Sequence, residues 1–166
     1  MRDLQEQQFR QMKLRYRQIH AGNDFPVRRF AESVYQARLK DEPALDAAAF
    51  FEEIQVMVQF KMTLERHGED SAGAATRQWV FRHDKTRDFF LMHAFLADQD
   101  DRVLRHLDDP RFRGVYIMLA SALPLEEART LRDAIVDHAA DSKDHHLSDA
   151  VVQVLKTRRA VQPQPI

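Results

Sequence analysis

Cysteine is absent from this chain, and its absence excludes several kinds of chemistry. With 0 cysteines in 166 residues, the protein can form no disulfide, offers no thiolate nucleophile and has no cysteine ligands for zinc. Proteins without disulfides suit reducing compartments. The sequence therefore predicts a cytoplasmic protein.

Glycine is scarce as well, which bears on nucleotide binding. The chain has only 4 glycines, at positions 22, 68, 73 and 114, and each is isolated. A phosphate-binding loop needs several closely spaced glycines, so that backbone N–H groups can approach the anion. We therefore expect that this chain alone neither hydrolyses a nucleotide nor binds one tightly. We also expect no cofactor and no catalytic residues, because the sequence contains no convincing catalytic constellation.

Long apolar runs and an excess of charge of one sign are missing too. The longest dense apolar stretch, FFLMHAFLA at 89–97, is about half of the roughly 20 residues that span a bilayer. The first residues, MRDLQEQQFR, contain no apolar segment of the kind found in secretory signals. The formal net charge of −1 provides no overall attraction to nucleic acid or to an anionic membrane. We expect neither a membrane protein nor a general nucleic-acid binder.

The residues that are present favour helices. Hydrophobic residues make up 44% and charged residues 31% of the chain, an ordinary balance for a helical protein. In three segments of the first part of the chain, apolar side chains recur three and four positions apart. They are Phe9, Met12, Tyr16 and Ile19; Val27, Phe30, Ala31 and Val34; and Phe50, Ile54, Met57 and Val58. We predict a helix on each, with Pro26 at the start of the second and Asp46 capping the third.

The spacing then changes to two residues, which is typical of half-buried strands. Met62 and Leu64 alternate with polar residues, and Trp79 and Phe81 form a second alternating pair. The small, glycine-containing segment between them suits a hairpin loop. We predict an antiparallel hairpin in which Trp79 is at least partly buried. Three helices followed by a hairpin is the element order of a winged-helix domain.

The rest of the chain is predicted to be helical. Asp84 is placed to cap a helix whose later residues are apolar all round apart from His93. Further helical patterns cover 103–107, 112–123, 125–140 and 147–158. The prediction is a mainly α protein with one hairpin, divided into a winged-helix-like domain at 1–97, a helical extension at 98–160 and a disordered tail at 161–166.

The step His83-Asp84 raises the question of a metal site. It resembles the His-Asp step of helical metal-dependent phosphohydrolases, in which imidazole and carboxylate hold a divalent metal that activates water. Here the step follows a strand-like segment, and no other histidine has convincing spacing to complete the set. We therefore favour a histidine at the end of a strand beside a capping Asp84, and we expect no metal.

One further cluster of polar residues and one isolated histidine could carry chemistry. The segment DHAADSKDHHLSD, at 137–149, combines His138, His145 and His146 with four aspartates, which suit zinc or nickel. Adjacent histidines on a helix point in different directions, so we interpret the segment as a solvated turn capped by Asp141 or Asp144. His93 is interpreted as a core residue that is hydrogen-bonded to backbone or water.

The predicted third helix bears on DNA binding. A winged-helix regulator places this helix in the major groove and offers basic or amide side chains to the bases. Here the helix reads FFEEIQVMVQF, and Glu52 and Glu53 would face the phosphates. The sequence therefore favours a protein partner over nucleic acid.

The segment WVFRHDKTRDFFLMHAFL, at 79–96, resembles a segment of NACHT-type STAND NTPases. In that family a strand ending F-x-F/R-H runs into a helix with an acidic-aromatic step, roughly F-x-H-x-x-x-x-[DE]-[FY]-[FL]. GNDFPVRRFAESVYQ and FKMTLERHG are similar to the helices and first strand of the family's winged-helix domain, and the resemblance covers about residues 20–125. It implies the winged-helix and helical region that follows the nucleotide-binding domain.

The resemblance also implies roles for single residues. His83 would be the winged-helix histidine that approaches the phosphates of a bound nucleotide and holds the inactive state. Asp88 and Phe89 would be the acidic-aromatic step, which packs at the start of the helix. The Walker motifs are missing from this sequence, so in this chain alone His83 would have no nucleotide to contact.

We therefore expect a non-catalytic regulatory or protein-interaction module of STAND type. The resemblance suggests a P-loop nucleotide-binding domain as its protein partner. Arg82, His83, Lys85 and Arg87 give a local positive charge, and we predict that they form the interaction surface. The alternatives are a metal-dependent phosphohydrolase of helical His-Asp type and a winged-helix DNA-binding regulator.

Overall fold

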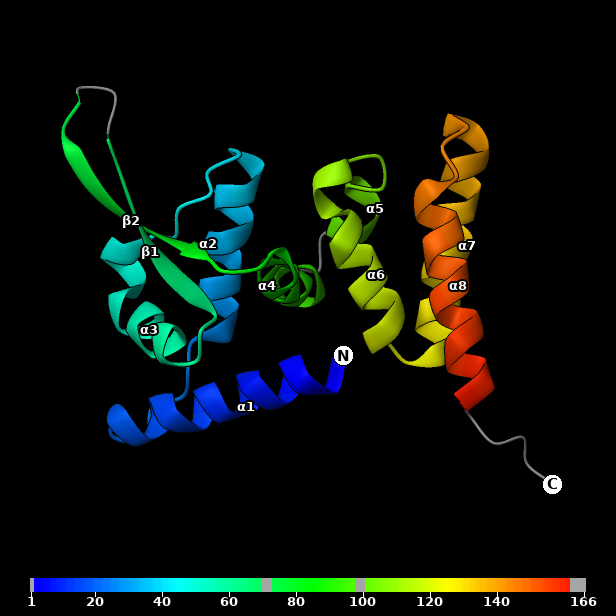
Figure 1. The fold of residues 1–166 in the computed structure, drawn as a ribbon. Helices are drawn as coiled ribbons and strands as arrows, with labels where there is room; N and C mark the ends of the chain where they lie inside the picture. Colours follow the sequence, from blue (N-terminus) through cyan, green and yellow to red (C-terminus); the bar gives the residue numbers. More distant parts are fainter. Residues whose placement is uncertain (1, 70–72, 98–100, 162–166) are drawn as a thin grey trace. The chain divides into compact units, whose positions relative to one another are not determined.

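A computed structural model describes residues 2–69, 73–97 and 101–161 of the chain. The fold is mainly helical with one two-stranded antiparallel hairpin, which confirms the predicted fold class (Figure 1). The chain divides into two compact units, Met1–Ala94 and Phe95–Ile166. This division falls inside a helix, whereas the sequence placed the domain boundary after residue 97.

The first unit begins with the predicted helices α1 (Arg2–Ile19), α2 (Val27–Leu39) and α3 (Ala47–Gln59). The carboxylate of Asp46 accepts a hydrogen bond from the backbone N–H of Ala49 at 3.0 Å, which confirms the predicted cap of α3. Within α3, Phe50 has φ −135° and ψ 34°, and these non-helical angles kink the helix near its start.

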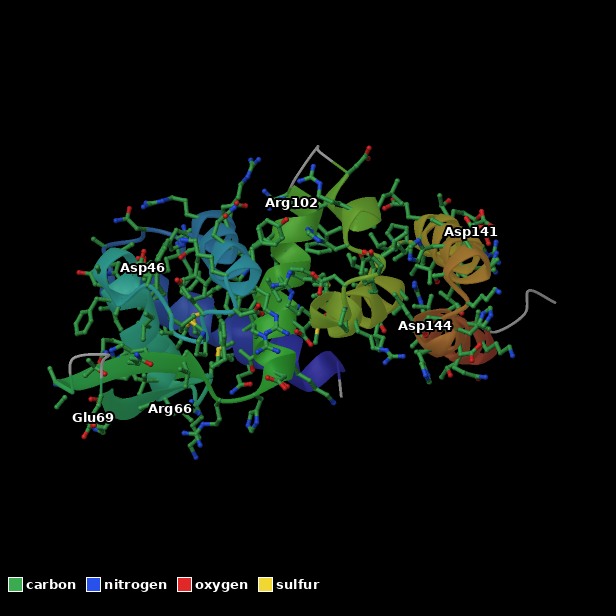
Figure 2. The ribbon with its side chains drawn as sticks, turned by 90° about the horizontal axis from the view of Figure 1, so that it is seen from above. Asp46, Arg66, Glu69, Arg102, Asp141 and Asp144 are labelled. Atoms are coloured by element: carbon green, nitrogen blue, oxygen red, sulfur yellow. The ribbon has the colours of Figure 1, made fainter. Side chains whose placement is uncertain are left out.

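The hairpin follows α3 and consists of β1 (Thr63–Glu69) and β2 (Ala75–Phe81). The register runs from Thr63 opposite Phe81 to Glu69 opposite Ala75. Its far end extends beyond the helices of the unit, and Figure 2 shows Arg66 and Glu69 on this part. Trp79 is half-buried, so the predicted hairpin and the predicted partial burial of Trp79 are both confirmed.

The burial pattern of β2 differs from the predicted alternation. The pattern placed Trp79 and Phe81 among the inward residues, yet Val80 is the buried residue of this strand. The reason is a contact with the connection between α2 and α3: Ala44 forms a β-bridge with Val80, and the N–H of Leu45 donates to the carbonyl of Trp79 at 2.7 Å. The connection therefore covers β2 on the edge away from β1.

Aromatic rings form the core of the first unit. Phe90, in α4 (Asp84–Ala97), is fully buried, and its ring centroid lies 4.8 Å from that of Phe30 and 5.6 Å from that of Phe9. Phe81, at the end of β2, stacks on Phe90 at 5.6 Å. Aromatic contacts at such distances add to the stabilisation that burial provides. Phe90 therefore joins α1, α2, the hairpin and α4.

The second unit contains the end of α4 and the helices that follow. These are α5 (Arg102–Arg105), the 3₁₀ helix η1 (Pro110–Phe112), α6 (Arg113–Ala122), α7 (Leu125–Ser142) and α8 (His146–Val161). Helices therefore occupy the predicted helical segments. Of the predicted tail, Val161 is the last residue of α8, and 162–166 lie outside the described residues.

Helices α6, α7 and α8 pack on one another, and α7 and α8 lie antiparallel side by side (Figure 1). Their buried residues are mostly aliphatic and include Val115, Leu119, Leu131, Ile135, Val151 and Leu155. Arg158 of α8 donates from Nη1 to the carbonyl of Ala120 at 2.6 Å and from Nη2 to the carbonyl of Leu123 at 2.8 Å. A cation at the C-terminal carbonyls of α6 also favours the helix dipole.

Candidate functional site

The predicted interaction residues lie where β2 ends and α4 begins. The N–H of Arg82 donates to the carbonyl of Met62 at 2.9 Å, which continues the pairing of the hairpin by one residue. The carbonyl of His83 then accepts from the N–H groups of Thr86 at 3.0 Å and of Arg87 at 3.4 Å, as expected at the start of a helix. The strand therefore passes directly into the helix at 82–83.

Three of the predicted residues share this exposed turn. Arg82, His83 and Lys85 are all exposed. The side chains of Arg82 and His83 make no hydrogen bond or ion pair with any residue that the structure describes. The charge of Arg82 is therefore open to a partner.

Arg87, the fourth predicted residue, is placed differently because it is bound within α4. Its Nη2 lies 3.2 Å from Oδ1 of Asp84, and its Nε lies 3.9 Å from Oδ1 of Asp88. Asp84 belongs to the first turn of the helix, where a negative charge is favourable. The charge of Arg87 is therefore largely balanced, and it adds less to a positive surface than the sequence predicted.

Asp88 is a buried carboxylate beneath the junction. The residue is only 9% exposed, and burial raises the pKa of its carboxyl to about 6. The charges of Arg87 and of Arg38 in α2 oppose this increase, and the charge of Asp84 adds to it. The adjacent Phe89 is also buried and packs on Phe9, with 4.7 Å between ring centroids. Both residues of the acidic-aromatic step therefore lie in the interior.

Sequence reasoning missed the ionisable character of this buried site. It assigned Asp88 to packing and did not consider that its proton affinity would change. One signal was present: Asp88 lies three and four positions before Leu91 and Met92, and residues at that spacing share one face of a helix. Both of these residues are buried, so Asp88 is on the inner face of α4.

The residues considered as metal ligands are not gathered into a site. In the parts of the chain that the structure describes, no group of three or more histidine or acidic side chains is arranged to hold a metal ion. His83 and Asp84 are exposed on the junction. Figure 2 shows Asp141 near the end of α7 and Asp144 just before α8.

The segment 137–149 forms the end of α7, a turn and the start of α8. Asp144 accepts a hydrogen bond from the N–H of His146 at 3.0 Å, which confirms the interpretation of a capped turn between helices. His145 and His146 are exposed, whereas His138 is half-buried. The three histidines therefore differ in their surroundings.

His93 lies in the aromatic core of the first unit. Its ring centroid is 4.8 Å from that of Phe89 and 5.8 Å from that of Phe9. Burial lowers the pKa of its imidazole, and the charge of Lys13 lowers it further. His93 is half-buried, so the predicted core position is confirmed only in part. The contacts shown for its side chain in the described part of the chain are with aromatic rings.

The acidic pair of α3 does not form one exposed surface. Glu52 is exposed, and its Oε2 lies 3.2 Å from Nδ1 of His20. Glu53 is buried and accepts a hydrogen bond from the hydroxyl of Tyr16 at 2.8 Å. Burial and this hydrogen bond raise the pKa of Tyr16 to about 12. Glu53 therefore belongs to the α1–α3 interface, and only Glu52 carries the argument that phosphates would repel α3.

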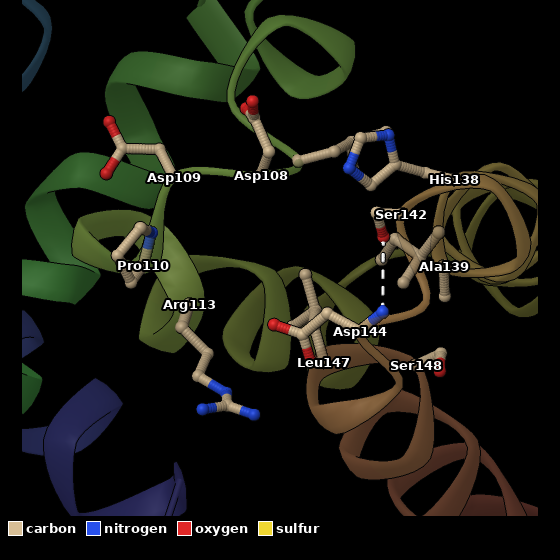
Figure 3. Close-up of a pocket in the computed structure, with 12 residues that line it drawn as sticks. Asp108, Asp109, Pro110, Arg113, His138, Ala139, Ser142, Asp144, Leu147 and Ser148 are labelled. Carbon is tan, nitrogen blue, oxygen red and sulfur yellow. Dashed lines mark hydrogen bonds between the residues drawn. The ribbon is translucent and has the colours of Figure 1, made fainter.

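A cavity of about 340 Å³ lies in the second unit (Figure 3). Its walls come from the segment 107–110, the start of α6, the second half of α7 and the start of α8. Of the histidines and aspartates singled out at 137–149, only His138 and Asp144 line it. Sequence reasoning did not identify this cavity, because its lining residues are far apart in the chain.

Comparisons with protein-family models, with curated proteins and with solved structures found no match to this chain. None of the helices in the described part of the chain is both long enough and apolar enough to cross a membrane.

Proposed function

We propose that this chain is a non-catalytic regulatory or protein-interaction module of the kind that the winged-helix and helical region forms in NACHT-type STAND NTPases. The observation that carries the proposal is the exposed turn at the junction of β2 and α4. Arg82, His83 and Lys85 are exposed there, and the side chains of Arg82 and His83 have no partner in the described part of the chain. A local positive surface on a chain with a net charge of −1 suits an acidic protein surface.

The proposed partner is a P-loop nucleotide-binding domain. His83 lies two residues after the end of β2 and is exposed, which suits a residue that faces a neighbouring domain. The hairpin pairing and the first turn of α4 fix the backbone on both sides of it. Such a rigid turn can present charge to a partner at little cost in conformational entropy.

The binding probe is a P-loop domain that is encoded in the same gene or in the reading frame directly upstream of it. The double variant Arg82→Glu, Lys85→Glu is expected to weaken binding by at least about tenfold, because it places negative charge against an acidic surface. Arg87 is left unchanged, since a carboxylate at this position would lie beside Asp84 and Asp88. Isothermal titration calorimetry at two salt concentrations measures the effect.

The matched control is Lys40→Glu, Arg66→Glu, which reverses two exposed charges away from the junction. Equal binding by both double variants would contradict the proposed surface.

Micromolar binding of ATP or ADP by this chain alone would contradict its assignment as a module that lacks a nucleotide site. About one metal per chain, lost in His83→Ala, would favour a phosphohydrolase, and salt-dependent DNA binding would favour a winged-helix regulator.

A further inference from the structure

A tight turn at 60–62 joins α3 to β1. The N–H of Lys61 donates to the carbonyl of Val58 at 2.9 Å, and the N–H of Met62 donates to the carbonyl of Met57 at 3.0 Å. This pair of bonds is a Schellman motif, in which the residue after the helix cap takes a left-handed conformation. Lys61 is that residue, and its φ is 57°. The turn therefore fixes the backbone of Lys61 at the start of the hairpin.

Lysine is an unusual residue at this position of the motif. Glycine is the common one, because a Cβ atom makes the left-handed conformation less favourable. Lys61 is exposed, and its side chain makes no hydrogen bond or ion pair with any residue that the structure describes. The dipole of α3 favours a cation at this end of the helix, but only slightly at an exposed position. The ammonium group of Lys61 is therefore open to a partner.

The hairpin places Lys61 beside the exposed turn of the junction. The N–H of Arg82 donates to the carbonyl of Met62, and β1 starts at the end of the hairpin where β2 leads into α4 (Figure 1). Because paired residues of this kind have Cα atoms about 5.5 Å apart, those of Lys61 and Arg82 lie within about 9 Å of each other. Sequence reasoning missed Lys61, since the whole hairpin separates it from Arg82 along the chain.

The positive charge of this region is limited in extent. Further along β1 the chain carries Glu65 and Glu69, and Asp84 follows the exposed turn. A nucleic acid carries phosphate charge along its whole length and would meet these carboxylates as well. A protein can place a few carboxylates together and leave the neighbouring positions uncharged, so it can match a small positive surface. Charge complementarity therefore favours a short acidic segment of a protein.

We propose that Lys61 is part of the junction surface, and that this surface binds a short, extended acidic segment of a protein partner. The inference rests on the proposed interaction function of the junction. An extended segment of about six residues reaches about 20 Å, which exceeds the separation of the Cα atoms of Lys61 and Arg82. Both side chains are long and exposed, so they can turn toward the carboxylates of one segment. Single exposed ion pairs are weak, and the affinity comes from several of them together.

The test uses the full chain, with a peptide of six glutamates as the probe in an NMR titration at low ionic strength. Lys61→Gly removes the charge and the backbone strain together. Binding of the peptide should weaken by about threefold, while the thermal transition of the first unit should not fall. Lys61→Gln removes the charge alone and should weaken binding to the same extent. Lys61→Arg keeps the charge and should bind like the unchanged chain.

The matched control is Lys143→Gly in the second unit. Lys143 is also exposed and also has a left-handed backbone, with φ 60°, directly after α7. Its substitution removes one charge and one strained residue from the chain, as Lys61→Gly does, but not from the junction. Peptide binding should therefore stay unchanged. An equal loss of binding in Lys143→Gly and Lys61→Gly would overturn the inference, because it would then reflect the overall charge.

The outcomes separate this inference from the proposed function. Equal peptide binding by Lys61→Gly and the unchanged chain would overturn the inference and leave P-loop domain binding through Arg82 and Lys85 intact. Peptide binding that depends on Lys61, without any binding of the P-loop domain, would support the inference and contradict the proposed partner. Tighter binding of a six-nucleotide single strand of DNA than of the peptide would overturn the acidic protein segment. No peptide binding at about 10 mM would overturn it as well.

Discussion

The junction of β2 with α4 and the cavity of the second unit are built in different ways. The junction residues follow one another at 82–88, and the local pairing of a strand end and a helix start positions them. The cavity takes its walls from separate segments that meet because α6, α7 and α8 pack together. A continuous site depends on a few backbone hydrogen bonds, whereas a discontinuous one depends on the packing of a whole unit. Substitutions in the two cores should therefore affect the two sites separately.

The largest expected effect comes from removing the aromatic ring below the junction. Phe90→Ala should lower the free energy of unfolding of the first unit by about 3–5 kcal/mol, because a fully buried ring leaves a cavity. Trp79 is the single tryptophan and lies in this unit, so its fluorescence reports the transition. An unchanged fluorescence transition would contradict the central position of Phe90.

The second effect is a gain of stability in the variant Asp88→Asn, and its size depends on pH. The pKa of Asp88 is about 6 in the folded chain and 3.8 as an ordinary aspartate, so the folded state holds the proton more tightly. Stability should therefore fall as the pH rises from about 4 to about 6 and stay at the lower level above that range. Asp88→Asn removes this loss, and we expect it to raise the free energy of unfolding at pH 7 by about 1–3 kcal/mol.

Denaturant titrations at pH 4 and pH 7 measure this effect. The gain from Asp88→Asn should be largely lost at pH 4, where the carboxyl is protonated in the folded chain. Asp84→Asn, at the exposed carboxylate of the same helix, is the control and should produce no gain at pH 7. A destabilised Asp88→Asn at pH 7 would show that the carboxylate is stabilised by contacts stronger than the 3.9 Å approach of Arg87.

The third effect concerns the second unit. Arg158→Ala removes the hydrogen bonds to the carbonyls of Ala120 and Leu123 and should lower the stability of this unit by about 1–2 kcal/mol. Circular dichroism should show the lower transition, while the fluorescence of Trp79 in the first unit should not change. Lys156→Ala, at an exposed position of α8, is the control. Equal transitions for both variants would contradict a capping role for Arg158.

The smallest expected effect is at the junction surface. The double variant Arg82→Glu, Lys85→Glu should change the stability of the first unit by no more than about 0.5 kcal/mol, because both side chains are exposed. A thermal transition followed by Trp79 fluorescence measures it. A loss of several kcal/mol would show that these side chains support the fold, and weaker partner binding could then not be assigned to the surface.

Periodicity was sufficient to predict the helices and the hairpin, because amphipathic helices and half-buried strands repeat at 3.6 and 2 residues. It could not predict that Val80 would be buried, since this depends on the bridge from Ala44, which lies in another connection. The same reason explains Glu53: its burial follows from the hydroxyl of Tyr16 on α1, and no pattern within α3 indicates that partner.

The candidate sites also differ in how far the sequence could predict them. Arg82, His83 and Lys85 could be chosen from the sequence because adjacent residues at a strand end share a turn. The pairing of Arg87 with Asp84 follows the spacing of three residues on a helix and was open to prediction. The cavity of the second unit was not, because only the packing of α6 against α7 and α8 brings its walls at 107–113 and 135–148 together.

The bridge between Ala44 and Val80 also affects how the hairpin meets other chains. β2 is paired with β1 on one side and forms a bridge with Ala44 at Val80 on the other, whereas within the described ranges no strand or bridge pairs with the outer edge of β1. Along this strand the chain reads ERHGE at 65–69, which is mostly charged. A strand from another molecule could add to this edge only by removing water from those charges, and charged edges are a known protection against edge-to-edge aggregation. The unpaired edge of the hairpin along β1 is therefore protected against uncontrolled association by its charge.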